Sequence, residues 1–187
     1  QLEQVHVVMG FPGLRQSAPE RYAAFLLNDV IGGSMSSRLF QEVRERQGLV
    51  YSIHSGVQAY LDTGVLYLYA ATDPGNFSKM LKAILKEIRE VKKNGITADE
   101  LKRAKDHLKG SLMLSLETSS SRMNRLAKHE MHLGSFLTMD DMIGAIEAVP
   151  HEDVQALVGQ FLDEDRLALT TLGPLDRRNL PRELLRH

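Results

Sequence analysis

The sequence predicts an α+β fold, in which several helices cover one face of a largely antiparallel β-sheet. The expected elements follow the order strand, two helices, hairpin, several helices, strand, which differs from the strand–helix alternation of a parallel doubly wound sheet. Two strand-like runs adjoin a short turn at residues 61–64, as in a hairpin. The segment 77–91 carries apolar residues at the 3.6-residue period of a helix that packs on one side.

The first elements are a strand and a buried helix. Val5–Phe11 is an apolar run that ends before Pro12-Gly13, which is typical of a strand. Ser17 and Glu20 have the spacing of a capping box, so we expect a helix to begin there. That helix is apolar around most of its circumference, which predicts deep burial, and Gly32-Gly33 should end it.

A shorter helix and a hairpin follow. The helix is expected at Ser37–Gln47, with Gly48 as its stop. The next run, Tyr51–Ala59, alternates between two faces, with Tyr51 on the same face as Ile53, and predicts a strand with one buried side. Val65–Thr72 is apolar on both faces, which is typical of a central strand.

The second half of the chain is expected to be mostly helical. Thr97 and Glu100 form another capping box, and further helices are predicted at residues 121–133, 139–148 and 151–162, before a closing strand at Arg166–Leu172. The stripe of the first long helix consists of Phe77, Met80, Leu81, Ile84, Leu85, Ile88 and Val91. The chain has 187 residues and no visible repeat or linker, so we expect residues 1–187 to form a single domain.

The composition excludes several classes of protein. The formal net charge is −1, from 23 basic and 24 acidic residues, so the surplus of positive charge expected of a nucleic-acid binder is missing. The absence of cysteine excludes thiolate chemistry and disulfides. No apolar run approaches the about 18 residues of a membrane span. We therefore expect a soluble protein with no nucleic acid or membrane as partner; the compartment stays open, with the cytoplasm favoured.

No catalytic motif of this chain's own is found. His129 and His132 are three residues apart, whereas a zincin helix needs two histidines four apart, so we interpret them as surface histidines. The serines at 34–37 and 119–121 precede expected helices, where hydroxyls cap free backbone N–H groups. We expect no metal site and no serine nucleophile.

One segment, from Gly32 to Ser52, is specific in a way that periodicity does not explain. It closely resembles the C-terminal half of the insulinase (pitrilysin, M16-type) family of zinc metallopeptidases, which includes mitochondrial processing peptidase. In that family an arginine and a tyrosine seven residues later flank a glycine and lie across from the zinc site. Arg44, Gly48 and Tyr51 match this spacing, and the likeness covers essentially the whole chain.

The resemblance implies a processing-peptidase-like fold and a role in binding substrate. Arg44 and Tyr51 would bind the peptide and support the transition state, because a guanidinium and a phenol both donate hydrogen bonds to a developing oxyanion. An extended peptide could also add to an exposed sheet edge. Gln1 is not an initiator methionine, and the chain is expected to be a fragment of a longer peptidase.

The family's zinc motif, His-x-x-Glu-His, does not occur in this sequence. The resemblance places zinc in a partner, the zinc-bearing N-terminal half, on the same polypeptide or as a separate subunit. If the halves are repeats, Ala24, Leu27 and Asn28 stand where that half has its ligands, and none of the three is a good zinc ligand. We therefore expect this chain alone to hold no metal and to be inactive.

Two other interpretations stay open. The family also contains inactive structural subunits, such as the core subunits of respiratory complexes, so the chain could be a scaffold on the same fold. A small-molecule binding domain of unrelated function is the third. The sequence also leaves open whether two copies of the isolated domain form a homodimer. A His-x-x-Glu-His motif upstream in the gene would favour the enzyme.

Overall fold

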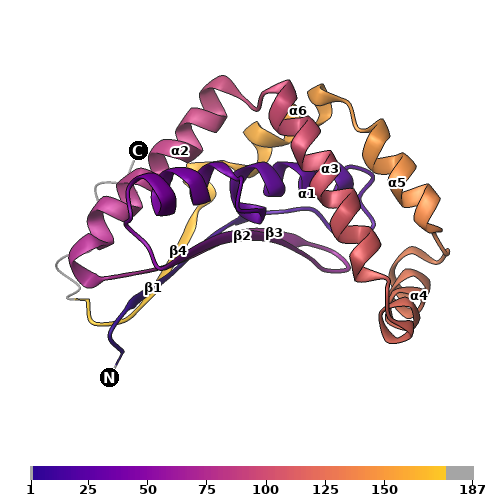
Figure 1. Cartoon of the computed structure of the whole chain (residues 1–187), viewed down its shortest axis with the longest axis horizontal. Coiled ribbons are helices and arrows are strands. Elements are labelled where there is room, and N and C mark those ends of the chain that lie inside the picture. The colour runs from indigo at the N-terminus through magenta and orange to yellow at the C-terminus, as the bar shows by residue number, and fades with distance from the viewer. Residues whose placement is uncertain (1, 176–187) are drawn as a thin grey trace.

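A four-stranded antiparallel sheet forms one layer of the structure and the helices form the other (Figure 1). The computed structural model describes residues 2–175. The strands are β1 (Val5–Pro12), β2 (Ser52–Ala59), β3 (Gly64–Thr72) and β4 (Ala168–Leu172). This arrangement confirms the predicted α+β class. The predicted single domain of residues 1–187 reaches at both ends beyond the residues described.

The strand order in the sheet is β2-β3-β1-β4, so the first strand is central and the last one forms an edge. β2 and β3 form the predicted hairpin, and β3 pairs with β1 in a register that sets Val7 opposite Ala70. β4 closes the other side of β1, with Val7 opposite Thr171. The edge strands are therefore β2 and β4.

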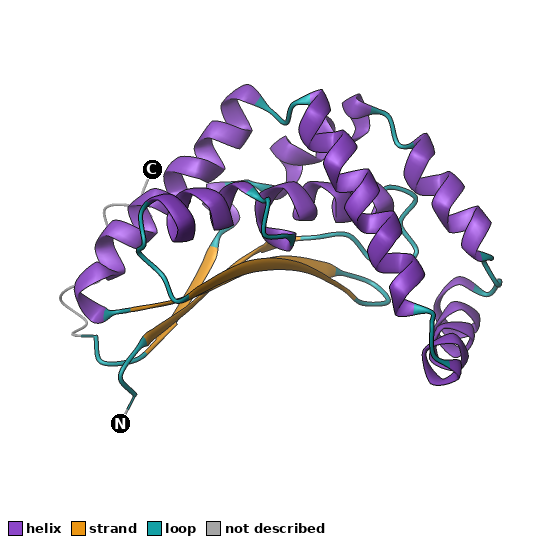
Figure 2. Ribbon diagram, in the orientation of Figure 1, coloured by secondary structure: helices purple, strands orange, loops and turns teal. Residues whose placement is uncertain are grey.

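The helices lie on one side of the sheet (Figure 2). The six α-helices of the described part are α1 (Arg21–Asn28), α2 (Phe77–Asn94), α3 (Ala98–Ser115), α4 (Ser119–Leu133), α5 (Met139–Ala148) and α6 (His151–Phe161). The shorter turns of helix are η1 (Asp29–Gly33), η2 (Phe40–Arg46), η3 (Pro74–Asn76) and η4 (Glu164–Arg166), of which η1 and η2 are π-helical. η1 continues α1 directly and ends at Gly33, as the glycine pair predicts.

The core lies between this helix layer and the sheet. Every member of the predicted stripe on α2 is buried, and Ile84 is 0% exposed. The stripe belongs to the same apolar cluster as Val7 and Met9 of β1 and Leu68 of β3, which alternate toward the helices as a pleated strand requires. The predicted core helix is therefore confirmed.

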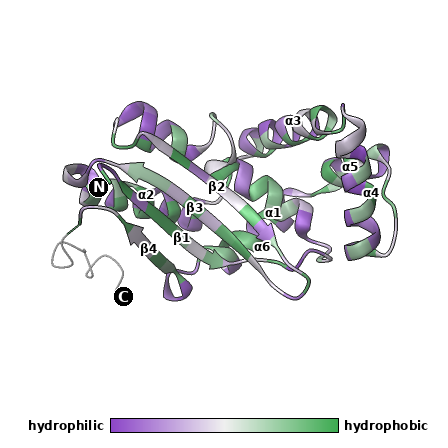
Figure 3. Ribbon diagram, turned by 90° about the horizontal axis from the view of Figure 1, so that it is seen from below, coloured by the Kyte–Doolittle hydropathy of each residue, from purple (hydrophilic) through white to green (hydrophobic). Residues whose placement is uncertain are grey.

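The opposite face of the sheet carries no helix in the described part of the chain (Figure 3). β3 is a central strand, as predicted, but it is not buried on both faces: Tyr67 and Tyr69 are only half-buried, and Val8 of the neighbouring strand is exposed. The reason is that all helices pack on the other face. On this open face the Nδ1 atom of His6 lies 2.8 Å from the Tyr69 hydroxyl.

One of the two predicted capping boxes forms and the other does not. The Thr97 hydroxyl accepts a hydrogen bond from the Glu100 backbone N–H, and the Glu100 carboxylate accepts one from Thr97 in return. By contrast, α1 begins only at Arg21, and its first turn receives no side-chain cap from Ser17 or Glu20. The prediction there was wrong, because buried Ala18 accepts from the Arg21 N–H and holds the preceding residues in a turn.

Glu100 also makes a largely buried ion pair that joins α3 to the residues just before η2. Nε and Nη2 of Arg38 donate to its two carboxylate oxygens at 2.6 and 2.7 Å, and Nη2 donates to the Gly95 carbonyl at 2.9 Å. Burial raises the pKa of Glu100, but the hydrogen bonds from Arg38 and Thr97 outweigh burial and lower that pKa from 4.5 to about 2.

This pair predicts a loss of stability in acid. A carboxyl whose folded-state pKa is lowered stabilises the fold above its unfolded-state pKa, and this contribution disappears as the pH falls through the folded-state value. The free energy of unfolding should therefore decline between pH 4.5 and about 2 as Glu100 is protonated. Urea unfolding across that range should show a smaller decline in Glu100→Gln. An equal decline in both proteins would contradict the assignment.

Candidate functional site

The exposed side of η2 positions Arg44. Leu39 and Val43 are buried and anchor this turn of helix to the core, while Arg44 projects outward. The helix is wider than an α-helix: the Gln47 N–H donates to the Glu42 carbonyl five residues earlier, at 3.2 Å. Such π-helical turns are frequent at functional sites.

Gly48 turns the chain from η2 toward β2. Its φ angle is +60°, a conformation that favours glycine because a side chain would be strained there. The Gly48 N–H still donates to the Arg44 carbonyl at 3.1 Å, and the Leu49 N–H donates to the Val43 carbonyl at 3.0 Å. Gly48 therefore ends the helix, as predicted, and β2 begins only a few residues after Arg44.

The backbone of Tyr51 is fixed although its side chain is not covered. Its N–H donates to the Ala71 carbonyl at 2.8 Å, and the buried Thr72 hydroxyl donates to the Leu49 carbonyl at 2.6 Å. The side chain is 59% exposed, whereas Ile53 is buried. The predicted common face of these two residues was wrong, because β2 begins only at Ser52 and its pleat does not extend to Tyr51.

Arg44 carries a charge that no carboxylate within residues 2–175 pairs with. Its guanidinium lies over the Phe40 ring, 4.9 Å from the centroid. The nearby acid Glu42 is occupied instead by Gln47 and Arg46, at 2.9 and 3.0 Å, and these hydrogen bonds lower the pKa of Glu42. Arg44 therefore keeps its hydrogen-bond donors available for a ligand.

Ala24, Leu27 and Asn28 of α1, which were expected at the ligand positions if the two halves are repeats, have structural roles in this chain. Ala24 and Leu27 are buried in the core, and the Asn28 side-chain oxygen accepts from the Ser55 hydroxyl at 2.8 Å. Asn28 thereby joins the end of α1 to β2. Across residues 2–175, no three His, Cys, Asp or Glu side chains are placed to share a metal ion.

His129 is partly buried and is not the surface histidine predicted from the sequence. The loop after α4 folds back, so that the Leu137 N–H donates to the His129 Nδ1 at 3.3 Å. Burial lowers the pKa of His129, and the positive charges of Arg125 and Arg21 lower it further. The Nδ1 of His132 is also buried and lacks a hydrogen-bond partner in the described part of the chain.

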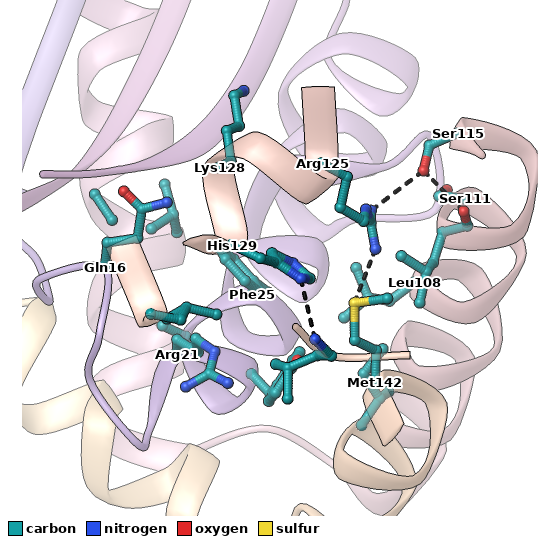
Figure 4. A pocket seen from close by; sticks show the side chains of 18 of the residues that line it. Gln16, Arg21, Phe25, Leu108, Ser111, Ser115, Arg125, Lys128, His129 and Met142 are labelled. Atoms are coloured by element: carbon teal, nitrogen blue, oxygen red, sulfur yellow. Dashed lines mark hydrogen bonds between the residues drawn. The ribbon is translucent and has the colours of Figure 1, made fainter. Parts of the chain in front are cut away.

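His129 lines a cavity of about 700 Å³ between α1, α3, α4 and α5, which was not predicted from the sequence (Figure 4). The signal in the sequence was on α3, whose apolar stripe continues past Leu101 and Ala104 to Leu108 and Leu112. In the structure the last two are only partly buried. Partly buried apolar side chains of this kind are typical of the lining of a ligand pocket.

No helix among the described residues is long and apolar enough to cross a membrane.

Comparisons with known proteins agree with the family resemblance. Residues 1–108 match the family described as "Peptidase M16 inactive domain". The uncharacterized zinc protease YmxG of Bacillus subtilis is 42% identical over 172 residues, which are 92% of this chain and 42% of that protein. An uncharacterized zinc protease of Streptomyces coelicolor is 40% identical over 96% of this chain and 39% of its own length. The chain thus spans about two fifths of these relatives.

Solved structures share the fold. The crystal structure of a peptidase M16 inactive domain from Pseudomonas fluorescens superposes with a TM-score of 0.82 at 26% identity, over 92% of this chain and 42% of that one. A chain of complex III2 from Candida albicans reaches a TM-score of 0.83 at 19% identity, over 98% of this chain and 47% of that one, a likeness of fold alone.

Proposed function

This chain belongs to the peptidase M16 inactive domain family, and from that premise we propose that it is the substrate-binding, non-catalytic half of a zinc-dependent endopeptidase. The substrates would be extended peptides or unfolded segments. Its partner would be a zinc-bearing N-terminal half, on the same polypeptide or as a separate subunit. Relatives described as zinc proteases, of which this chain spans about two fifths, support a further part that carries the metal.

The observation that carries the proposal is the exposure of Arg44 and Tyr51 on either side of Gly48. Neither side chain hydrogen-bonds to another residue in the described part of the chain, although the backbone that bears each of them is held by hydrogen bonds. Because the backbone is already held, ligand binding has to order only the two side chains, whose donors are unused.

The chemistry of the two donors suits peptide hydrolysis. Attack on the scissile carbonyl builds negative charge on its oxygen, and a phenol together with a guanidinium can donate to that oxyanion or to neighbouring substrate carbonyls. We propose that Tyr51 and Arg44 act in this way and that the zinc of the partner half supplies the activated water. This chain contributes position and charge.

The second candidate function is a scaffold subunit without peptidase activity. It stays a candidate because the same fold occurs in a chain of complex III2. The match of Arg44 and Tyr51 to the arginine and tyrosine of the active family members favours the peptidase.

An assay of mixed halves tests the proposed function. The zinc-bearing half and this chain are produced separately, and each is assayed alone and together on an unstructured, fluorescence-quenched peptide. We expect hydrolysis only from the mixture, and we expect a chelator to abolish it. Hydrolysis by the zinc-bearing half alone at the rate of the mixture would contradict the need for this chain. A whole protein without the zinc motif and without activity would support the scaffold instead.

A further inference from the structure

The cavity between α1, α3, α4 and α5 has the size and lining of a site for a small ligand. It holds about 700 Å³, within the range of about 300–1,000 Å³ that such sites occupy. Its apolar wall comes from Phe25 on α1, Leu108 and Leu112 on α3, and Met142 on α5. The cavity is separate from Arg44 and Tyr51, neither of which lines it.

The charged residues of the lining are all basic. Arg15, Arg21, Arg125 and Lys128 line the cavity together with His129, and no aspartate or glutamate does. The chain as a whole is close to neutral, with a formal net charge of −1, so this excess of positive charge is local. A cavity lined by charges of one sign attracts a ligand of the opposite charge.

The two arginines beside His129 have only neutral partners in the described part of the chain. Arg125 donates to the Met142 sulfur at 2.8 Å and lies 3.5 Å from the Ser115 hydroxyl, and burial lowers its pKa. Arg21 donates to the Ala18 carbonyl at 3.2 Å and lies over the Tyr22 ring. Figure 4 shows the His129 ring between these two side chains. An anion placed there would meet two guanidinium groups that no carboxylate among the described residues pairs with.

Helix α4, which forms part of the cavity wall, is incompletely packed. None of the residues of α4, Ser119–Leu133, is buried, although α1 and α2 each bury four or more. Leu133 of α4 lines the cavity. An apolar molecule in the cavity would therefore give α4 the contacts that it lacks.

We propose that this cavity binds an anionic amphiphile, a single hydrocarbon chain with one oxyanion head group. The hydrocarbon lies against Phe25, Leu108 and Leu112, and the head group lies among Arg21, Arg125 and His129. The charge of the lining favours such a molecule over a peptide segment. The charged residues of the lining donate hydrogen bonds and cannot accept them, so they match an anionic head group, whereas a peptide backbone carries no net charge.

Calorimetric titration of the protein at its full natural length tests the proposal. The probes are dodecanoate and dodecyl phosphate, compared with dodecanol and dodecyltrimethylammonium, all below micellar concentrations. We expect one or both anions to bind about tenfold or more tightly than dodecanol, and the cation more weakly still. Preference for dodecanoate identifies a carboxylate site, and preference for dodecyl phosphate a phosphate site. Equal binding of all four probes would overturn the proposal.

Single substitutions test whether the amphiphile binds in this cavity. Arg125→Met should weaken the binding of the two anions about tenfold or more and leave the affinity for dodecanol unchanged. The matched control, Arg103→Met, alters an exposed arginine of α3 that does not line the cavity, and it should change nothing. Leu112→Trp should block every probe by filling the cavity. Equal losses in Arg125→Met and Arg103→Met would place the anion elsewhere and overturn the assignment.

Hydrogen exchange on the unaltered protein keeps the proposal testable if Leu112→Trp fails to fold. Saturating dodecanoate should slow amide exchange in α4 and leave α2, which is already packed, unchanged. Unchanged exchange in α4 at saturation would overturn the proposal. If an acidic, apolar peptide bound at this site and neither anionic amphiphile did, the surface would be a peptide-docking site and the proposal would be wrong.

Discussion

Replacing Tyr51 with phenylalanine is expected to lower the kcat of the assembled peptidase by about 10²–10³, with KM much less affected. The change removes the hydroxyl and keeps the ring, and the side chain is exposed, so the fold should not respond. A phenol that donates mainly to the developing oxyanion stabilises the transition state more than the bound substrate, which is why kcat carries the effect. The measurement is steady-state hydrolysis of an unstructured quenched peptide.

Tyr60→Phe is the matched control for this result. Tyr60 is also an exposed tyrosine, but it lies at the turn of the hairpin, at the other end of β2 from Tyr51. Its loss of a hydroxyl should leave kcat within a few-fold of the unaltered protein. If Tyr51→Phe were equally mild, Tyr51 would have no catalytic role, and the scaffold function would be favoured.

Arg44→Ala should affect the same step or the positioning of the substrate, and the two changes should not be additive. When two residues share one task, the double variant loses less than the product of the single losses. Arg46→Ala serves as the control, since Arg46 lies on the same turn of helix but already pairs with Glu42 at 3.0 Å. Fully multiplicative losses in the double variant would show that Arg44 and Tyr51 act on separate steps.

Ile84→Ala is expected to lower the free energy of unfolding by about 2–5 kcal/mol. Ile84 is 0% exposed and belongs to the main apolar cluster, so its truncation removes buried apolar surface and leaves a cavity in a close-packed interior. Denaturant unfolding of the two proteins measures the difference. A loss below about 1 kcal/mol would mean that α2 repacks around the gap.

Arg44→Ala is the contrasting variant for the same experiment. Arg44 is exposed and has only the contact with the Phe40 ring among the described residues, so its removal should lower the free energy of unfolding by about 1 kcal/mol or less. A cost equal to that of Ile84→Ala would show that Arg44 supports the fold, and its proposed contact with substrate would lose its basis.

The features that follow from short stretches of sequence were predictable. The stripe on α2 was identified from its period alone, because any helix with that pattern must bury one face. The Thr97–Glu100 capping box and the turn at Gly48 were likewise predictable, since each depends on the chemistry of a few neighbouring residues. The residues Arg44 and Tyr51 were singled out by resemblance, because periodicity treats them as ordinary surface and strand residues.

Only the tertiary structure decided how distant segments meet. Arg38 pairs with Glu100, which is 62 residues away in the sequence. His107 Nδ1 lies 2.6 Å from Asp29 Oδ1, although the two residues are 78 positions apart. No local sequence pattern predicts either contact. The Ser17–Glu20 box failed for the same reason: the burial of Ala18 set the start of α1, and a local cap contributes only about 1 kcal/mol against such packing.

The cationic cavity shows this division most plainly. Its basic residues come from the turn before α1, from α1 itself and from α4, and the sequence distributes them among acidic neighbours that give a net charge of −1. Sequence therefore determined which residues are apolar, charged or helix-forming. Only the packing of the helices decided that basic and apolar side chains line one cavity while no aspartate or glutamate does. The reason is that the distribution of charge in space depends on which helix faces meet.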